Sequence, residues 1–240
     1  MMKKIYEEIL KAKAQNQKSL AILLDPDKVD FEAIGSLIHQ LKKSPATHIF
    51  VGGSHVETTK IDFLIQSLKE HLHIPIVLFP GSPSQISTFA DGILFLSLLS
   101  GRNPDYLIEH HVNAISVLKN STLEIISTGY ILIESGSETA VERISKTKPL
   151  DSKNIEYVCQ TAKAGEYLGN KLIYLEAGSG AKLAVPLEMI KAVSQEISIP
   201  LIVGGGIRSQ KAIQNAFDAG ADLVVIGTAF ENDSNFFNHD

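Results

Sequence analysis

Eight short apolar runs recur from one end of the chain to the other, and amphipathic segments separate most of them. The runs are apolar throughout, without strict alternation, which is typical of parallel strands covered on both faces. Apolar residues at helical spacing predict helices over 29–44, 60–72, 103–120, 152–169, 185–197 and 209–220. Repeated strand–helix units favour an α/β fold closed as a (β/α)8 TIM barrel over an open, doubly wound sheet. The apolar runs are 20–26, 48–54, 74–82, 90–98, 124–134, 171–180, 199–207 and 221–229.

The ends of the chain depart from this repeat. The first 19 residues predict an extra amphipathic helix, and the last ten are too short for a complete closing helix. No linker or shift in composition divides the 240 residues, a length that α/β barrels often reach as one domain. The sequence therefore predicts a single barrel domain over residues 1–240, with a short C-terminal segment.

Charge and hydropathy argue against a nucleic-acid partner and against a membrane-spanning helix. Lysine and arginine number 22 against 27 acidic residues, a net charge of −5, and no basic block is present, so nucleic acid is not expected as a partner. No run approaches the roughly 18 apolar residues of a membrane-spanning helix. A soluble, cytoplasmic protein is expected.

Glycine and polar residues follow the apolar runs and do not precede them. In barrels of this kind, the loops after the strands converge on one face and build the site. The last two such loops predict a phosphate cradle of bare backbone N–H groups, at Gly204, Gly205 and Gly206 and at Gly227 with Thr228. Alternatively, these glycines only permit sharp turns.

An acid ends the sixth run, in the stretch "YLEAGSG". Glu176 is expected to accept hydrogen bonds from a ligand hydroxyl or to take its proton, although it could instead brace the loop. The hydroxyl of Tyr174 is a second candidate contact, with simple packing as its alternative.

The first run ends in "DPDK", which we expect on the opposite side of the barrel mouth from the cradle. Carboxylates suit Mg²⁺, so Asp25 is the first candidate ligand, with the Ser54 hydroxyl as a second. Asp27 and Asp30 are interpreted as caps of the following helix. Lys28 could meet a phosphate or remain solvated.

The histidines are assigned no metal, because none shows the spacing of a helical metal pair, and His55 is interpreted as an ordinary loop residue. A phosphate pocket and a metal-binding acid together suit a phosphate-bearing acceptor and a diphosphate-bearing donor. The apolar run 90–98 could line a groove for a hydrocarbon tail or simply fill the barrel.

The chain resembles the geranylgeranylglyceryl phosphate synthases and their heptaprenylglyceryl relatives in the motifs "AILLDPDK", "FVGGS", "VLFPGSPSQIS", "ADGILFLSLLSGRNPDYLI", "GYILIESG", "YLEAGSGA", "LIVGGGIRS" and "VVIGTAFE". The resemblance implies a Mg²⁺-dependent prenyltransferase of ether-lipid synthesis, which joins sn-glycerol 1-phosphate to a polyprenyl diphosphate, expected to be geranylgeranyl diphosphate. It also implies a homo-oligomer, a dimer or a hexamer. Transient contact with a membrane surface is expected for the lipid product.

Site residues follow from the same resemblance. Asp25 and Ser54 would bind Mg²⁺. Glu176, from its place at the end of the sixth run, is the expected catalytic residue, which orients the acceptor hydroxyl and could remove its proton. The chain has no tryptophan, so an aromatic residue that limits prenyl length in some relatives must differ here. Thr228 stands where some members carry asparagine. Substrate would contact Tyr174, Leu175, Glu176, Ala177, Gly178, Ser179 and Gly180, with its phosphate at Gly205, Gly206, Gly227 and Thr228.

Two other functions remain open from the residues alone. The same cradle would serve an isomerase or lyase of a phosphorylated sugar or heterocycle, which needs a base but no prenyl groove. A non-catalytic barrel that binds a phosphorylated metabolite is the second. Neither explains why "DPDK" and "YLEAGSG" occur together.

Overall fold

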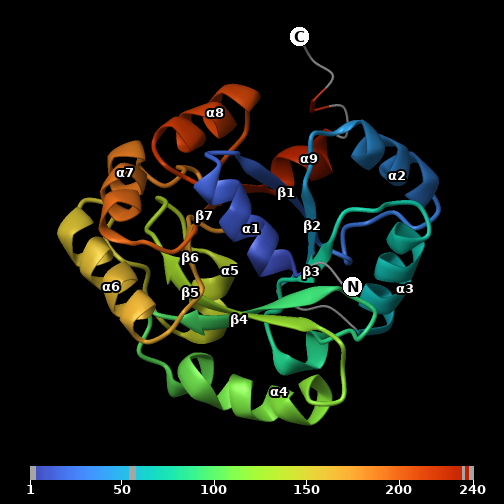
Figure 1. Cartoon of the computed structure of the whole chain (residues 1–240), viewed down its shortest axis with the longest axis horizontal. Helices are drawn as coiled ribbons and strands as arrows, with labels where there is room; N and C mark the ends of the chain where they lie inside the picture. The colour runs from blue at the N-terminus through green and yellow to red at the C-terminus, as the bar shows by residue number, and fades with distance from the viewer. Residues whose placement is uncertain (1–3, 54–57, 234–235, 238–240) are drawn as a thin grey trace.

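Eight parallel strands close into a barrel in the order β1 to β8, with β1 paired to β8 (Figure 1). The computed structural model describes residues 4–53, 58–233 and 236–237. All eight predicted strands are confirmed, and the closed sheet confirms the barrel over the doubly wound alternative. The strands are β1 Ser19–Leu24, β2 His48–Val51, β3 Ile76–Leu78, β4 Gly92–Leu98, β5 Glu124–Leu132, β6 Leu172–Glu176, β7 Leu201–Gly204 and β8 Leu223–Ile226.

Helices surround the barrel on the outside (Figure 1). Each helical segment predicted from the spacing of apolar residues contains a helix, usually shorter at its start. Between β3 and β4 there is only the short 3₁₀ turn η1, Pro83–Gln85. The helices are α1 Ile5–Ala14, α2 Ile34–Lys43, α3 Thr58–Lys69, α4 His110–Leu118, α5 Ala140–Ser145, α6 Ile155–Tyr167, α7 Leu187–Glu196, α8 Gln210–Asp218 and α9 Thr228–Asn232, and a π-helix, η2 Asp105–Glu109, precedes α4.

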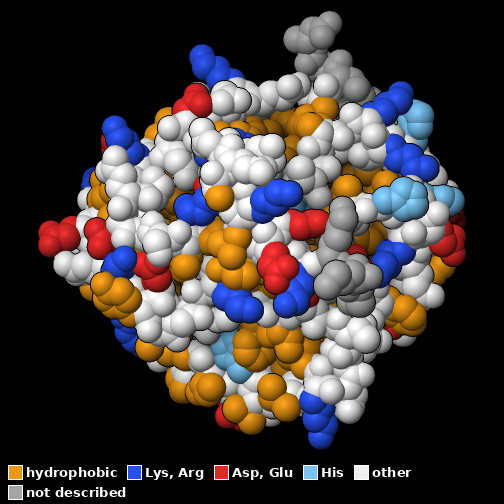
Figure 2. Space-filling view, viewed as in Figure 1, with side chains coloured by type: hydrophobic (Ala, Val, Ile, Leu, Met, Phe, Trp, Pro, Cys, Tyr) orange, Lys and Arg blue, Asp and Glu red, His pale blue; other side chains and the backbone are white. Residues whose placement is uncertain are grey.

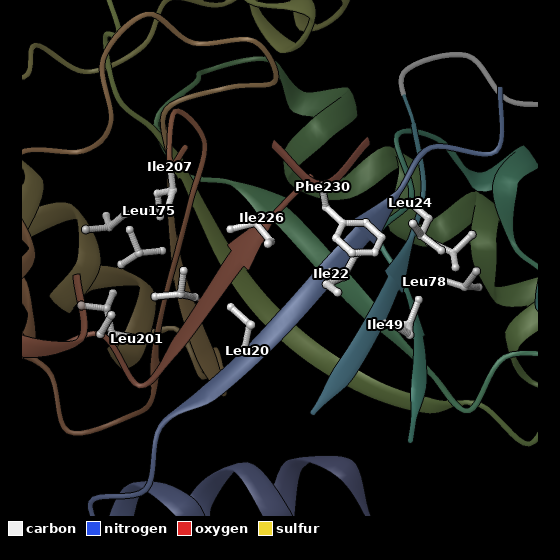
Figure 3. Packing of buried hydrophobic residues seen from close by; sticks show 14 of the residues in the cluster. Leu20, Ile22, Leu24, Ile49, Leu78, Leu175, Leu201, Ile207, Ile226 and Phe230 are labelled. Carbon is white, nitrogen blue, oxygen red and sulfur yellow. The ribbon is translucent and has the colours of Figure 1, made fainter. Parts of the chain in front are cut away.

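The larger core lies between the strands and the surrounding helices. Alternate residues of each strand, such as Ile22 and Leu24 of β1, point outward into it (Figure 3). Phe230 of the short helix α9 packs in the same cluster, beside Ile22. Full burial of each such side chain contributes about 1.5–3 kcal/mol, so this layer holds the strands in the register that aims their loops.

The predicted N-terminal helix closes one end of the barrel. In Figure 1, α1 lies across the strands, and its Ile5 and Ile9 are buried against the residues that fill the barrel interior. The Glu124 carboxylate at the start of β5 accepts the backbone N–H of Tyr6 at 3.0 Å and that of Ile5. A carboxylate at these free N–H groups stabilises the first turn of the helix. Polar loops therefore build a site only at the other end, after the strands.

The surface on the face shown in Figure 2 mixes basic and acidic side chains, with no patch of one sign. Apolar side chains gather toward the bottom of that view, near α4, where Ile108, Val112 and Ile115 are exposed. Within the residues that the structure describes, no helix has the length and apolar character needed to cross a bilayer.

Candidate active site

A single cavity at the carboxyl end of the barrel gathers most of the predicted site residues. Its wall includes Asp25, Tyr174 and Glu176, which come from β1 and β6 or directly follow them. The loops after β6, β7 and β8 complete its polar side with Gly178, Ser179, Gly180, Gly205, Gly206, Gly227 and Thr228.

Glu176 is the last residue of β6, and its carboxyl group is buried. The backbone N–H of Gly178 donates to its Oε1 at 2.6 Å, which fixes the orientation of the carboxylate. Loss of contact with water raises the pKa of Glu176 to about 7, and interactions with the Gly178 N–H and then the Tyr174 hydroxyl oppose this rise only in part. A carboxyl group with a pKa near neutrality is well suited to accept and release a proton.

Three aromatic rings form the floor of the cavity. Tyr174 lies 5.5 Å from Phe79 and 5.3 Å from Tyr130, measured between ring centroids. Burial, and then the neighbouring Glu176 carboxylate, raise the pKa of Tyr174 well above its usual value, so it remains a protonated donor. Its buried hydroxyl makes no hydrogen bond of ordinary geometry with the described residues. It lies beside the Glu176 carboxylate, and a buried hydroxyl with its hydrogen-bonding capacity unfilled is available to a ligand.

Gly205 is required by its surroundings. Its φ of +80° lies in the left-handed region, and a Cβ there would collide with the Glu176 carboxylate and come within 2.6 Å of the Gly178 backbone nitrogen. The loops after β6 and β7 therefore lie against each other. Gly227 differs, because a Cβ there would meet only ordinary contacts with Leu23. The need for a sharp turn therefore accounts for glycine at position 205, whereas steric constraints do not account for glycine at position 227.

Only some side chains of the segment from Tyr174 to Gly180, which was expected to contact the substrate, face the cavity. Successive residues of β6 point to opposite sides, so Tyr174 and Glu176 face the barrel interior. Leu175 and Ala177 instead pack into the outer core, and the structure does not bring their side chains to the cavity. Arg208 was not singled out from the sequence, yet it lines the cavity and donates to the Ala181 carbonyl at 2.7 Å.

Asp25 lies beside the β8 loop and not across the mouth from it, because β1 pairs with β8 when the barrel closes. The Asp25 backbone N–H donates to Glu231 Oε1 of α9 at 3.4 Å. The Lys28 ammonium lies 3.0 Å from Glu231 Oε2 and 3.7 Å from Asp25 Oδ2. Lys28 is therefore paired with acids, and Glu231 is a cavity residue to which the sequence analysis gave no role.

The interpretation of Asp27 and Asp30 as helix caps is wrong. Helix α2 begins only at Ile34, and no side chain caps it. Asp30 instead accepts the N–H of Glu32 in the preceding turn, and Asp27 pairs with Lys60 at 2.7 Å. The apolar pattern of 29–44 begins five residues before helix α2, so the caps were expected too early in the chain.

Ser54 and His55 lie outside the described residues. Among those described, no group of three or more His, Cys, Asp or Glu side chains could hold a metal ion. The carboxylates of Asp25 and Glu231 nevertheless fit Mg²⁺, which typically takes one or two protein carboxylates and completes its shell with phosphate oxygens and water.

An apolar arm extends the cavity between β4 and α4. Phe95, Tyr106, His111, Ala114 and Ile144 contribute to its wall. The ring of His111 lies 4.2 Å from that of Phe95, and burial lowers the pKa of His111, so this histidine is a neutral wall residue. The sequence analysis did not predict that 103–120 lines this arm. The π-helix η2 adds a residue to the turn and so changes which side chains of this segment face the barrel.

Comparison with known proteins agrees with this geometry. A model of the PcrB family matches residues 12–239. The "Geranylgeranylglyceryl phosphate synthase" of Flavobacterium johnsoniae is 64% identical over 233 residues, which are 97% of this chain and 96% of that protein.

Two solved structures share the whole architecture. The (S)-3-O-geranylgeranylglyceryl phosphate synthase of Thermoplasma acidophilum, in complex with its substrate sn-glycerol-1-phosphate, superposes with a TM-score of 0.92 at 31% identity, covering 99% of this chain and 95% of that one. The wild-type enzyme of Thermoplasma volcanium gives 0.91 at 32% identity, over 98% and 94% of the two chains. The chain therefore belongs to the PcrB family, together with the geranylgeranylglyceryl phosphate synthases.

Proposed function

We propose that this protein is a Mg²⁺-dependent prenyltransferase that forms an ether bond between sn-glycerol 1-phosphate and a polyprenyl diphosphate, releasing diphosphate. One observation carries the proposal. A single cavity combines a buried carboxyl group of pKa about 7, a rim of backbone amides, an acid pair and an apolar arm. A small phosphate ester would lie on the polar side, and a hydrocarbon tail would lie in the arm.

The acceptor would lie beside β6. Backbone N–H groups of Gly205, Gly206 and Gly227 would bind its phosphate, and the Thr228 hydroxyl would add a donor. The Tyr174 hydroxyl, beside Glu176, would bind an oxygen of the glycerol. Fixing the acceptor at both ends leaves its free hydroxyl in one place, which lowers the entropic cost of the reaction.

Glu176 would act on that hydroxyl. As the allylic carbon–oxygen bond of the donor breaks, its electron pair leaves with the diphosphate, and the hydroxyl oxygen of the acceptor attacks the carbon. The proton of the hydroxyl passes to Glu176 Oε2, because Oε1 is held by Gly178. The aromatic floor excludes water from the reacting carbon, which protects it from hydrolysis.

The donor would occupy the arm and the acidic end. Asp25, with Ser54, would hold Mg²⁺, which when bound supplies positive charge to the leaving diphosphate. Phe95, Tyr106 and Ile144 would contact the hydrocarbon tail. The homo-oligomer (dimer or hexamer), the cytoplasmic location, the single domain over 1–240 and the transient contact with a membrane surface stay predictions from the sequence.

The test is an incubation of the protein with radiolabelled sn-glycerol 1-phosphate, Mg²⁺ and prenyl diphosphates of graded chain length, followed by extraction into organic solvent. We expect label in the organic phase that depends on the donor. Parallel reactions with sn-glycerol 3-phosphate and with EDTA report the stereochemical and metal requirements.

Other outcomes separate the rival functions. EDTA-insensitive turnover of a phosphorylated sugar or heterocycle would favour the isomerase or lyase. Binding of glycerol phosphate without extractable product across all donors would favour the non-catalytic barrel.

A further inference from the structure

Two carboxylates at the acidic end of the cavity are held in place by backbone N–H groups. Asp25 Oδ1 accepts the N–H of Asp27 at 3.1 Å, and Glu231 Oε1 accepts the N–H of Asp25 at 3.4 Å. Each carboxylate is thus anchored through one oxygen. The side chains are mostly buried, with 21% of Asp25 and 15% of Glu231 exposed.

The second oxygens of both carboxylates face the same point, which the Lys28 ammonium occupies. Its Nζ lies 3.7 Å from Asp25 Oδ2 and 3.0 Å from Glu231 Oε2. The Lys28 side chain is 47% exposed, whereas the acids are more buried, so the ammonium approaches them from the solvent side. A lysine has a flexible stem and can leave such a position without moving the backbone.

The charges of this trio do not balance. One ammonium compensates one of the two carboxylates and leaves a net charge of −1 within the trio. A divalent cation at the same point would neutralise both acids. It would also release the ammonium, which would then be free to meet an anion in the same cavity.

We propose that Glu231 is a further ligand of the divalent cation, together with Asp25, and that the Lys28 ammonium holds this position until the cation binds. The released lysine then contacts the diphosphate. The identification of the cation as Mg²⁺ and of the anion as a prenyl diphosphate rests on the proposed function. The inference that the ammonium and a divalent cation share one position is independent of that function.

The test is calorimetric titration of the full-length protein with Mn²⁺ alone, with no phosphate compound present. Removing the competing ammonium in Lys28→Met should tighten Mn²⁺ binding by about tenfold or more, since a unit charge a few ångströms away opposes a divalent ion by roughly 1–2 kcal/mol even in water-like surroundings. Adding Glu231→Gln to Lys28→Met should reverse this gain. Gln keeps an oxygen for the Asp25 N–H but carries no charge.

Two results would overturn the proposal. Mn²⁺ affinity that is unchanged in Lys28→Met would show that the ammonium does not compete with the cation. Equal affinities of Lys28→Met and the double variant would show that Glu231 is not a ligand. If Glu231→Gln does not fold, Glu231→Asp, which withdraws the carboxylate by one methylene, should weaken binding in the same background. Binding of Mn²⁺ is measured without turnover, so a protein that fails as a prenyltransferase can still pass or fail this test.

Discussion

Replacement of Glu176 by glutamine should change how the stability of the protein depends on pH. In the folded protein, burial raises the pKa of this carboxyl group from 4.5 to about 7. Between these values the folded state binds a proton that the unfolded state has lost. The Glu176 contribution to the free energy of unfolding is therefore full below pH 4.5 and is lost as pH rises through 7.

The magnitude follows from the two pKa values. At about 1.4 kcal/mol for each pKa unit, the wild-type protein should lose about 3 kcal/mol between pH 4.5 and 8.5 through this one group. Glutamine has no charge to bury. The difference in stability between Glu176→Gln and wild type should thus shift by about 3 kcal/mol in favour of the variant over this range, which is about 6–12 °C in Tm for a chain of this size.

The assay is urea denaturation of both proteins across this pH range. Other groups cancel in the comparison, including the buried His48, whose pKa burial lowers to about 4 and which acts in the opposite direction. The exposed Glu70→Gln is the matched control and should show no shift. A difference between Glu176→Gln and wild type that does not vary with pH would refute the assignment of a raised pKa to this buried carboxyl.

Three further predictions concern the same cavity. In the wild type, kcat/KM for product formation should rise with pH, with a midpoint near 7. Glu176→Gln should abolish this rise and lower the rate roughly 10²–10⁴-fold. An unchanged pH profile in the variant would show that Glu176 does not take part in the proton transfer. Tyr174→Phe removes a hydroxyl that makes no hydrogen bond of ordinary geometry, so its Tm should change little, while KM for glycerol phosphate should increase about fivefold or more. A large loss of Tm with unchanged KM would contradict this. Gly205→Ala should cost about 1–3 kcal/mol in urea denaturation, because a Cβ is forced into a left-handed position against Glu176, and should weaken binding of inorganic phosphate; a variant as stable as wild type would contradict the geometry.

The barrel and the polar end of its cavity could be predicted because they depend on local patterns. Each apolar run followed by glycine identified a strand and its direction, and direction alone brings the residues after β1, β6, β7 and β8 to one face. Glu176 and Gly205 were found in this way. The alternation of β6 would also have separated Leu175 from Tyr174, had it been applied to the whole segment.

What could not be predicted depends on contacts between distant segments. The pairing of Lys28 with Glu231 joins residues 203 positions apart, and nothing near either one reveals it. One wall of the apolar arm, the run 90–98, was predicted as a possible lining, and its residues do line the cavity. The opposite wall, from 103–120, was not predicted, because the π-helix η2 leaves no mark in the spacing of apolar residues. The placement of Asp25 opposite the cradle was an error of a different kind, because a closed barrel already requires β1 to neighbour β8.

The helix α1, held by Glu124 over the starts of the strands, acts as a stopper. Side chains such as Leu172 and Leu223 fill the barrel interior next to it, so the described residues leave no passage through this end of the barrel. In the proposed reaction, both substrates would therefore enter, and the product would leave, away from this closed end. Bound product would then compete with both substrates, and its release into a membrane or a carrier would limit the rate of turnover.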